Sequence, residues 1–228
     1  MSKISSNYQL LIAKLDEFIR KYYVNRLIKG ALYSVGLILL AILALTLLES
    51  QFYFPTNVRA AFFFGFLTLS AFVLINWMII PMMQYFKLGK VISHQQAASI
   101  IGTHFSNVED KLLNILQLKH QASQVSDASL IEASIDQKIE DIKPVPFSGA
   151  IDLRNNKKYV KYAAIPLLRF LVLLFGAPQL LTTIANRIID YKTHYDPAAP
   201  FHFQLVTDNL EAVQHEDLTV EVKIEGSA

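Results

Sequence analysis

The residue types that most often carry out catalysis are present in this 228-residue sequence without the spacing that catalysis needs. None of its six histidines falls in the HExxH pattern, which places two metal ligands on one face of a helix, and there is no cysteine. The eight glycines form neither the GxGxxG nor the GxxxxGK loop that holds phosphate groups, and no serine lies in a GxSxG turn. We therefore expect a chain that is not an enzyme and that binds no cofactor and no metal.

One charged residue, Arg169, lies inside a long apolar segment. An arginine at the centre of a membrane helix costs about 2.5–3.5 kcal/mol on insertion scales, so its position needs an explanation. Two interpretations stay open. The guanidinium could extend along the helix to the membrane surface, or it could make a polar contact with Asn76, with another helix or with another subunit.

Two pairs of small residues lie in other apolar segments at a spacing of four. Gly30 is followed by Ser34, and Ala61 is followed by Gly65. This spacing lets membrane helices approach closely. The pairs predict contacts either between helices of one chain or between subunits, and Asn76 could hydrogen-bond across either kind of interface.

The elements that must position these residues are membrane helices. Hydrophobic residues make up 53% of the chain and charged residues 18%, against roughly 25% charged residues in soluble domains, which argues against a wholly soluble protein. Residues 30–48 (GALYSVGLILLAILALTLL) carry no charge and are long enough to cross a hydrocarbon core about 30 Å thick. Residues 60–83 form a second uncharged segment, and the short connection 49–59 makes the two an antiparallel hairpin. A third transmembrane helix is predicted over 162–185.

Basic residues are concentrated on one side of the predicted membrane. Six lysines and arginines lie in residues 1–29 and ten in 84–161, whereas 49–59 has one and 186–228 has three. The positive-inside rule therefore predicts a cytoplasmic N-terminus and a cytoplasmic 84–161 region. The short loop and the C-terminal part are expected outside.

The predicted cytoplasmic parts are helical. Residues 1–29 have the pattern of a basic amphipathic helix, which could lie along the inner leaflet or pack on the 84–161 region. The 84–161 region itself predicts three short amphipathic helices, whose apolar faces could cover one another or contact another protein. The basic charge is explained by topology, so we expect no nucleic-acid binding.

Near the C-terminus the apolar pattern changes from the helical period to the period of two that is typical of strands. Phe201, Phe203 and Leu205 alternate with polar residues, and so do Val222 and Ile224. Two or three strands cannot bury an apolar face by themselves. We therefore expect residues 196–228 to be the first strands of an exported immunoglobulin-like β-sandwich, and the chain to be the N-terminal part of a longer protein. The predicted fold class is a mainly α membrane protein with three transmembrane helices, a small helical cytoplasmic insertion and the start of that exported domain.

Three segments resemble the N-terminal region of a domain-of-unknown-function family of very large bacterial envelope proteins: NYQLLIAKLDEFIRKYYVNRLIKGALYSVGLILL, KLGKVISHQQAASIIGTHFSNVEDKLLNILQL and IDLRNNKKYVKYAAIPLL. The resemblance implies an inner-membrane anchor that precedes a long periplasmic region. It implies partners among other envelope proteins, self-association, or a MoxR-type ATPase system, besides the lipid bilayer. The expected function is a non-enzymatic anchor and scaffold, and the alternative is a transmembrane receptor with a periplasmic ligand-binding region.

Overall fold

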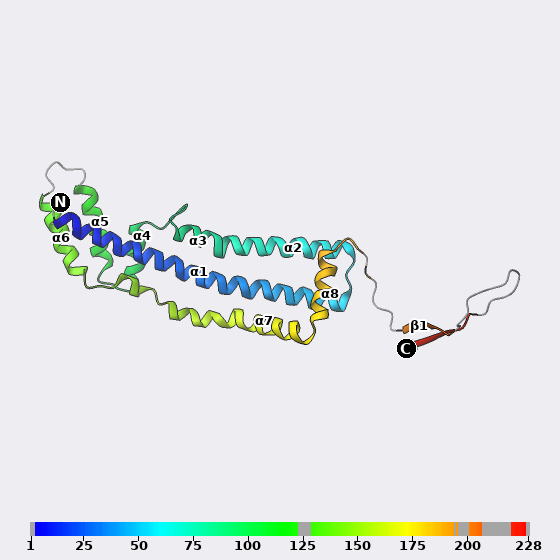
Figure 1. Ribbon diagram of the computed structural model, residues 1–228. Helices are drawn as coiled ribbons and strands as arrows, with labels where there is room; N and C mark the ends of the chain where they lie inside the picture. Colours follow the sequence, from blue (N-terminus) through cyan, green and yellow to red (C-terminus); the bar gives the residue numbers. More distant parts are fainter. Residues whose placement is uncertain (1–2, 123–128, 194, 196–200, 207–219, 227–228) are drawn as a thin grey trace.

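The computed structural model describes residues 3–122, 129–193, 195, 201–206 and 220–226. Helices predominate in these ranges and run in order from α1 to α8, followed by one antiparallel pair of strands (Figure 1). The mainly α architecture predicted from the sequence is confirmed.

Within the described ranges, three helical segments are long and apolar enough to cross a membrane, as predicted. The first belongs to α1 (Lys3–Phe52). The second comprises α2 (Thr56–Leu74), a π-helical turn (Ile75–Ile79) and α3 (Ile80–Tyr85), and the third is α7 (Lys157–Gly176). Because α1 lies between the other two, it is the central helix of the layer (Figure 1).

The outer faces of these three segments carry large apolar side chains. Leu47, Phe72 and Leu168 are each about two-thirds exposed, one on each segment. A surface of this kind is costly in water and favourable in hydrocarbon. The exposed faces therefore suit contact with lipid chains.

Helix α1 is continuous over 50 residues, which is about 75 Å at 1.5 Å per residue. The sequence pattern separated an amphipathic helix over 1–29 from a membrane helix over 30–48. In the structure these are successive parts of one helix. No glycine or proline lies between Lys3 and Lys29, so the helix has no residue there that favours a break.

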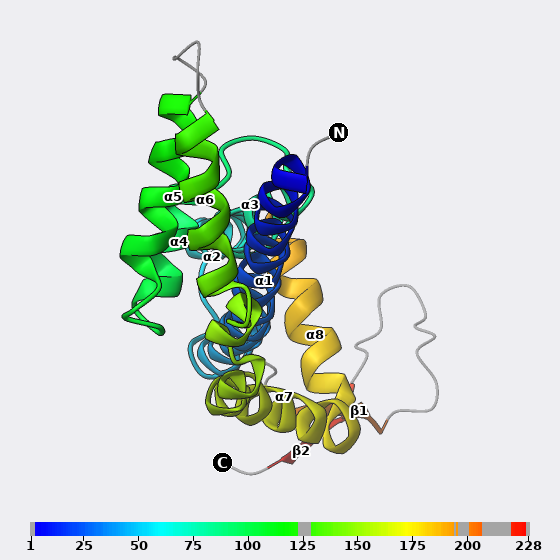
Figure 2. The same ribbon diagram turned by 90° about the vertical axis from the view of Figure 1, so that its left-hand side faces the viewer.

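The N-terminal half of α1 belongs to a small helical domain. α4 (His94–Gly102), α5 (Glu109–Ala122) and α6 (Ser129–Ile142) gather on one side of it (Figure 2). Leu15 and Phe18 of α1 are completely buried in the shared core. The other helices contribute Ala97, Ala98, Ile101, Leu112, Ile115, Ile135, Ile139 and Ile142. The apolar faces of the four helices therefore cover one another.

Polar contacts fix how this domain joins the long helices. Ser93 begins α4 with a capping box: its hydroxyl accepts from the Gln96 amide at 3.2 Å, and the Gln96 side chain accepts from the Ser93 amide at 3.0 Å.

Asp16 of α1, outside the apolar segment, accepts from Lys87 at 2.7 Å and contacts His94 Nε2 at 3.0 Å. Burial raises the pKa of Asp16, but the hydrogen bonds from Lys87 and His94 outweigh it, so the pKa lies below its ordinary value. Asp16 is therefore ionised at neutral pH.

Gly30 of α1 packs against the Trp77 carbonyl. In a regular α-helix that carbonyl would accept from the amide of residue 81, which is a proline and has none. The backbone opens into the π-helical turn just before Pro81, a common response to proline in a helix. A Cβ on Gly30 would collide with the Trp77 carbonyl, so only glycine permits this approach.

Gly36 of α1 makes the same kind of contact with α7. Its neighbour is the carbonyl of Tyr162, which lies four residues before Pro166 and so also lacks its regular helical donor. A Cβ on Gly36 would collide with this carbonyl group. At both contacts, therefore, a glycine of the central helix lies against a carbonyl whose regular helical donor position is a proline.

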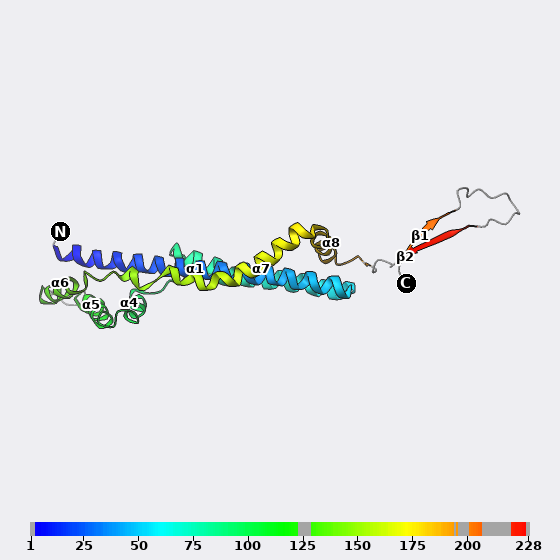
Figure 3. The same ribbon diagram turned by 90° about the horizontal axis from the view of Figure 1, so that it is seen from below.

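The third apolar segment is interrupted inside the range 162–185 that was predicted for it. α7 ends at Gly176, and α8 (Pro178–Ile189) runs across the end of the layer, from α7 towards α2 (Figures 1 and 3). Pro178 cannot donate the next hydrogen bond of α7, whereas it fits the first turn of a new helix. Leu181 and Ile184 of α8 are buried against the layer and its opposite face is exposed, which is the pattern of a helix lying in a membrane interface.

In the described residues, two strands follow α8. β1 (Phe201–Leu205) pairs antiparallel with β2 (Val222–Gly226), with Phe203 opposite Ile224. These two short strands make up the whole sheet in the described part of the chain and do not by themselves form the immunoglobulin-like sandwich that was predicted. The predicted turn and the start of the second strand, at 208–218, lie outside the described residues.

Candidate functional site

A buried ion pair joins α1 to α2 at the end of the layer away from the helical domain. Arg59 Nε donates to Glu49 Oε1 at 2.8 Å, and both side chains are completely buried. Arg59 Nη1 also donates to the Thr193 carbonyl at 3.1 Å, which ties the segment after α8 to the pair. Glu49 Oε2 and Arg59 Nη2 have no hydrogen-bond partner in the described part of the chain. Because a buried charge is costly without its counterion, the pair fixes how the α1–α2 connection is arranged.

A second arginine, Arg187 of α8, lies near this pair with two tyrosines. The Tyr195 ring centre is 5.0 Å from Cζ of Arg59 and 5.6 Å from Cζ of Arg187. Cζ of Arg187 is also 4.8 Å from the ring centre of Tyr53. All three distances are within the range of cation–π attraction. None of the ion pairs between described residues includes Arg187. The carboxylate of Asp190, three residues further on, accepts from the Thr193 hydroxyl at 2.7 Å and from the Tyr195 hydroxyl at 3.4 Å.

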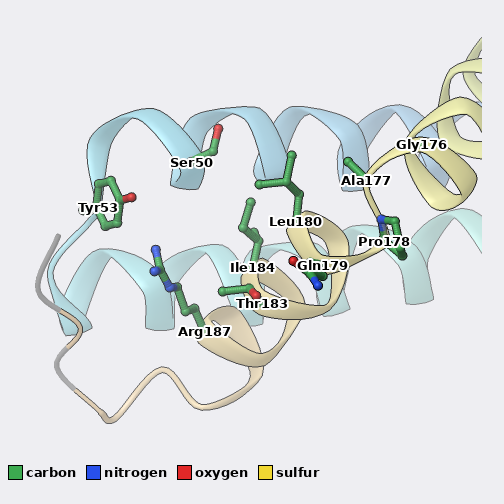
Figure 4. A pocket seen from close by; sticks show the side chains of 10 residues that line it. All are labelled: Ser50, Tyr53, Gly176, Ala177, Pro178, Gln179, Leu180, Thr183, Ile184 and Arg187. Atoms are coloured by element: carbon green, nitrogen blue, oxygen red, sulfur yellow. The ribbon is translucent and has the colours of Figure 1, made fainter. Parts of the chain in front are cut away.

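A pocket of about 640 Å³ lies beside Arg187, between the end of α1 and α8 (Figure 4). The Arg187 guanidinium points towards Tyr53, the first residue after α1, as Figure 4 shows. Arg187 Nε is buried and has no hydrogen-bond partner among the described residues. The described lining holds no aspartate or glutamate, and its other polar members are Ser50, Gln179 and Thr183. A guanidinium whose Nε has no hydrogen-bond partner among the described residues, together with a lining that holds no carboxylate there, makes this pocket suited to an anion.

An apolar groove of about 400 Å³ adjoins the polar pocket. Its lining comes from α1, α2, α7 and α8 and includes Leu45, Phe66 and Leu174. Ile184 of α8 is part of the lining of both hollows, so they are neighbours on either side of this residue. The two together place a cationic, polar space next to an apolar one at the end of the membrane-spanning layer.

The first pair of small residues predicted from the sequence lies between helices of this chain. Gly30 is buried against the Trp77 carbonyl, and Ser34 is 1% exposed. The sequence argument missed Gly36, which lies on the same helix and faces α7. Gly36 lies two residues after Ser34, so it does not form a pair at the spacing of four that the sequence argument used. The sequence feature that could have indicated this contact is Pro166 in the facing segment.

The other predicted residues do not come together in the structure. Ala61 and Gly65 lie on an exposed face of α2, and no described atom lies within 4 Å of a Cβ built on Gly65. Asn76 Nδ2 donates to the Phe72 carbonyl of its own helix at 2.9 Å instead of bridging two helices. Arg169 is exposed on α7, and no hydrogen bond or ion pair joins it to Asn76 or to another residue in the described ranges.

Metal-binding side chains are dispersed in the described ranges, where no three histidines or carboxylates gather at one place. Comparisons of the chain with protein-family models, with curated proteins and with solved structures give no match. The functional proposal below is therefore based on the geometry of the molecule.

Proposed function

We propose that this chain is a non-enzymatic membrane anchor and scaffold of a bacterial envelope protein, with the helical domain in the cytoplasm and the β strands in the periplasm. The observation that supports this best is the continuity of α1. Its first half lies in the core of the helical domain, and its second half is the central helix of the membrane-spanning layer. An anchor needs this kind of rigid connection between a soluble domain and the bilayer.

Aromatic residues at the two ends of the layer support a membrane position. The Tyr33 ring lies 5.7 Å from Trp77 and 5.3 Å from Tyr159, and Lys29 Nζ lies 5.5 Å from the Tyr159 ring centre. Tyr53 directly follows the end of α1, twenty residues after Tyr33, and a helix of that length spans about 30 Å. This matches the thickness of a hydrocarbon core, whose two surfaces favour such aromatic residues.

The distribution of basic residues supports the orientation. Lysines and arginines at the end near the helical domain include Lys29, Lys87, Lys157, Lys158 and Lys161. Arg59, Arg187 and Lys192 lie at the opposite end. Positive charge near span ends favours the cytoplasmic side, so the helical domain is assigned to the cytoplasm.

Single-cysteine labelling tests this topology directly, because the natural chain has no cysteine and gives no background. Gln51→Cys lies in the last turn of α1 and Gln117→Cys lies in α5, and both glutamines are exposed. In bacterial spheroplasts, a membrane-impermeant maleimide is expected to label the first variant and to leave the second unlabelled until the membrane is permeabilised. Labelling in the reverse order would overturn the orientation, and release of the chain by alkaline carbonate would overturn the anchor.

The β strands support a role in assembly outside the membrane. Leu205, Val222 and Ile224 are between 48% and 63% exposed, so the hairpin presents apolar side chains that further strands could cover. This is the basis for keeping an immunoglobulin-like exported domain in the proposal. The resemblance to the large envelope family suggests other envelope proteins, further copies of the chain or a MoxR-type ATPase system as partners.

The continuity of α1 also favours a second candidate function, a receptor in which binding outside shifts the cytoplasmic helices. Hydrogen exchange of residues 94–142 in the full chain distinguishes the two, measured with and without a periplasmic extract. A scaffold is expected to keep its exchange rates and to co-purify with envelope proteins in a fixed ratio. Exchange rates in α4–α6 that change with the extract would favour the receptor instead.

A further inference from the structure

The pocket beside Arg187 has the chemistry of a phosphate site. An arginine presents a planar set of N–H donors that matches the oxygens of a phosphate group. The Arg187 guanidinium is held in place by the Tyr53 and Tyr195 rings, while its buried Nε has no hydrogen-bond partner among the described residues. Thr183 lies one helical turn before it on the same pocket wall and adds a hydroxyl donor.

The surroundings of the pocket indicate what carries the phosphate. The pocket lies where α1 and α7 end and where the amphipathic α8 crosses the layer, which is the level of lipid headgroups in the proposed membrane position. The apolar groove that begins at Ile184 runs between the membrane-spanning helices and could receive an acyl chain. A phospholipid has both a phosphate group for the pocket and an acyl chain for the groove, whereas a free phosphate ion has no apolar part that could fill the groove.

We propose that this pocket binds the phosphate group of a membrane phospholipid, with the phosphate at Arg187 and an acyl chain in the groove past Ile184. The inference rests on the membrane position of the chain but not on its role as a scaffold. In this proposal α8 does more than pack across the end of the layer, because it supplies residues to both the pocket and the groove.

The test uses the full chain purified in detergent and three probes: dihexanoyl phosphatidylglycerol, dihexanoylglycerol without phosphate, and inorganic phosphate. Binding is measured by native mass spectrometry and by the shift in thermal unfolding temperature. The phospholipid is expected to bind and to raise the unfolding temperature, with at least tenfold weaker binding of the other two probes. Equal effects of inorganic phosphate would support the phosphate site but overturn the lipid as its source. Equal binding of dihexanoylglycerol would overturn the site.

Three variants keep the result interpretable. Arg187→Gln removes the cation and is expected to weaken phospholipid binding at least tenfold, while Lys192→Gln removes a charge from the same end, outside the pocket lining, and is expected to stay within twofold. Thr183→Glu places a carboxylate four residues before Arg187, an arrangement that stabilises a helix and also occupies the guanidinium. This variant is expected to unfold no earlier than the natural chain and yet to lose phospholipid binding. Unchanged binding in Thr183→Glu would overturn the proposal, even if Arg187→Gln failed to fold.

Discussion

Replacing Gly36 by alanine is expected to force α1 and α7 apart and to lower the free energy of unfolding by about 1–3 kcal/mol, the usual cost of overpacking. The added Cβ would lie 3.0 Å from the carbonyl carbon of Tyr162 and closer still to its oxygen. Those atoms belong to the backbone of α7, so they cannot rotate away as the end of a side chain could. Gly30→Ala is expected to act in the same direction between α1 and the π-helical turn, where the Cβ would lie 2.8 Å from the carbonyl carbon of Trp77.

Gly65→Ala is the matched control for these substitutions. It makes the same chemical change in a membrane-spanning helix, but no described atom lies within 4 Å of the new Cβ, and alanine favours helix more than glycine does. We expect it to be neutral or slightly stabilising. Unfolding can be followed in mixed micelles by the fluorescence of Trp77, the one tryptophan of the sequence. Equal stability of Gly36→Ala and Gly65→Ala would contradict the close contact.

Breaking the buried ion pair is expected to have the second large effect. Arg59→Met leaves the Glu49 carboxylate buried without its counterion and removes the hydrogen bond to the Thr193 carbonyl. Removing one member of a buried pair typically costs about 3–5 kcal/mol. The same mixed-micelle titration measures the loss, and hydrogen exchange of residues 178–189 should rise as α8 loses its connection to α2.

A double substitution shows whether the loss comes from the uncompensated charge. In Glu49→Leu with Arg59→Met no charge remains buried, and an apolar pair of similar volume is often as stable as the ion pair it replaces. We expect the double variant to be more stable than Arg59→Met. Arg20→Met serves as a control, since Arg20 is exposed on the part of α1 that belongs to the helical domain and a surface substitution usually changes stability by less than about 0.5 kcal/mol. Additive losses in the double variant would show that the two residues act independently.

Hydropathy and charge predicted the membrane-spanning layer well because those properties are local. Residues 30–48 and 60–83 both lie in helices of the structure, and the period of three and four in α4, α5 and α6 predicted the helical domain. The break after Gly176 was missed because the apolar composition continues past it into α8. In that segment Pro178 mattered more than mean hydropathy, since it starts a new helix with a different direction.

The candidate site was harder to predict because its residues are brought together by tertiary contacts. Glu49 and Arg59 lie ten residues apart in a segment that was treated as a simple connection. Opposite charges at the two facing ends of a helical hairpin could have suggested their pairing. Arg187 and Tyr195 come from a part of the chain about 130 residues further on, and sequence spacing contains no information about that approach.

The unbroken course of α1 has a mechanical consequence. Each residue of an α-helix advances the chain by 1.5 Å and turns it by about 100°. Between Tyr23, buried in the helical domain, and Gly30, seated against the Trp77 carbonyl, the angular setting of the domain relative to the bilayer is therefore fixed by a count of residues. One residue inserted there would rotate the domain by about a quarter turn around the axis of α1. A torque applied to the helix near Glu49 would likewise be transmitted to the domain through α1.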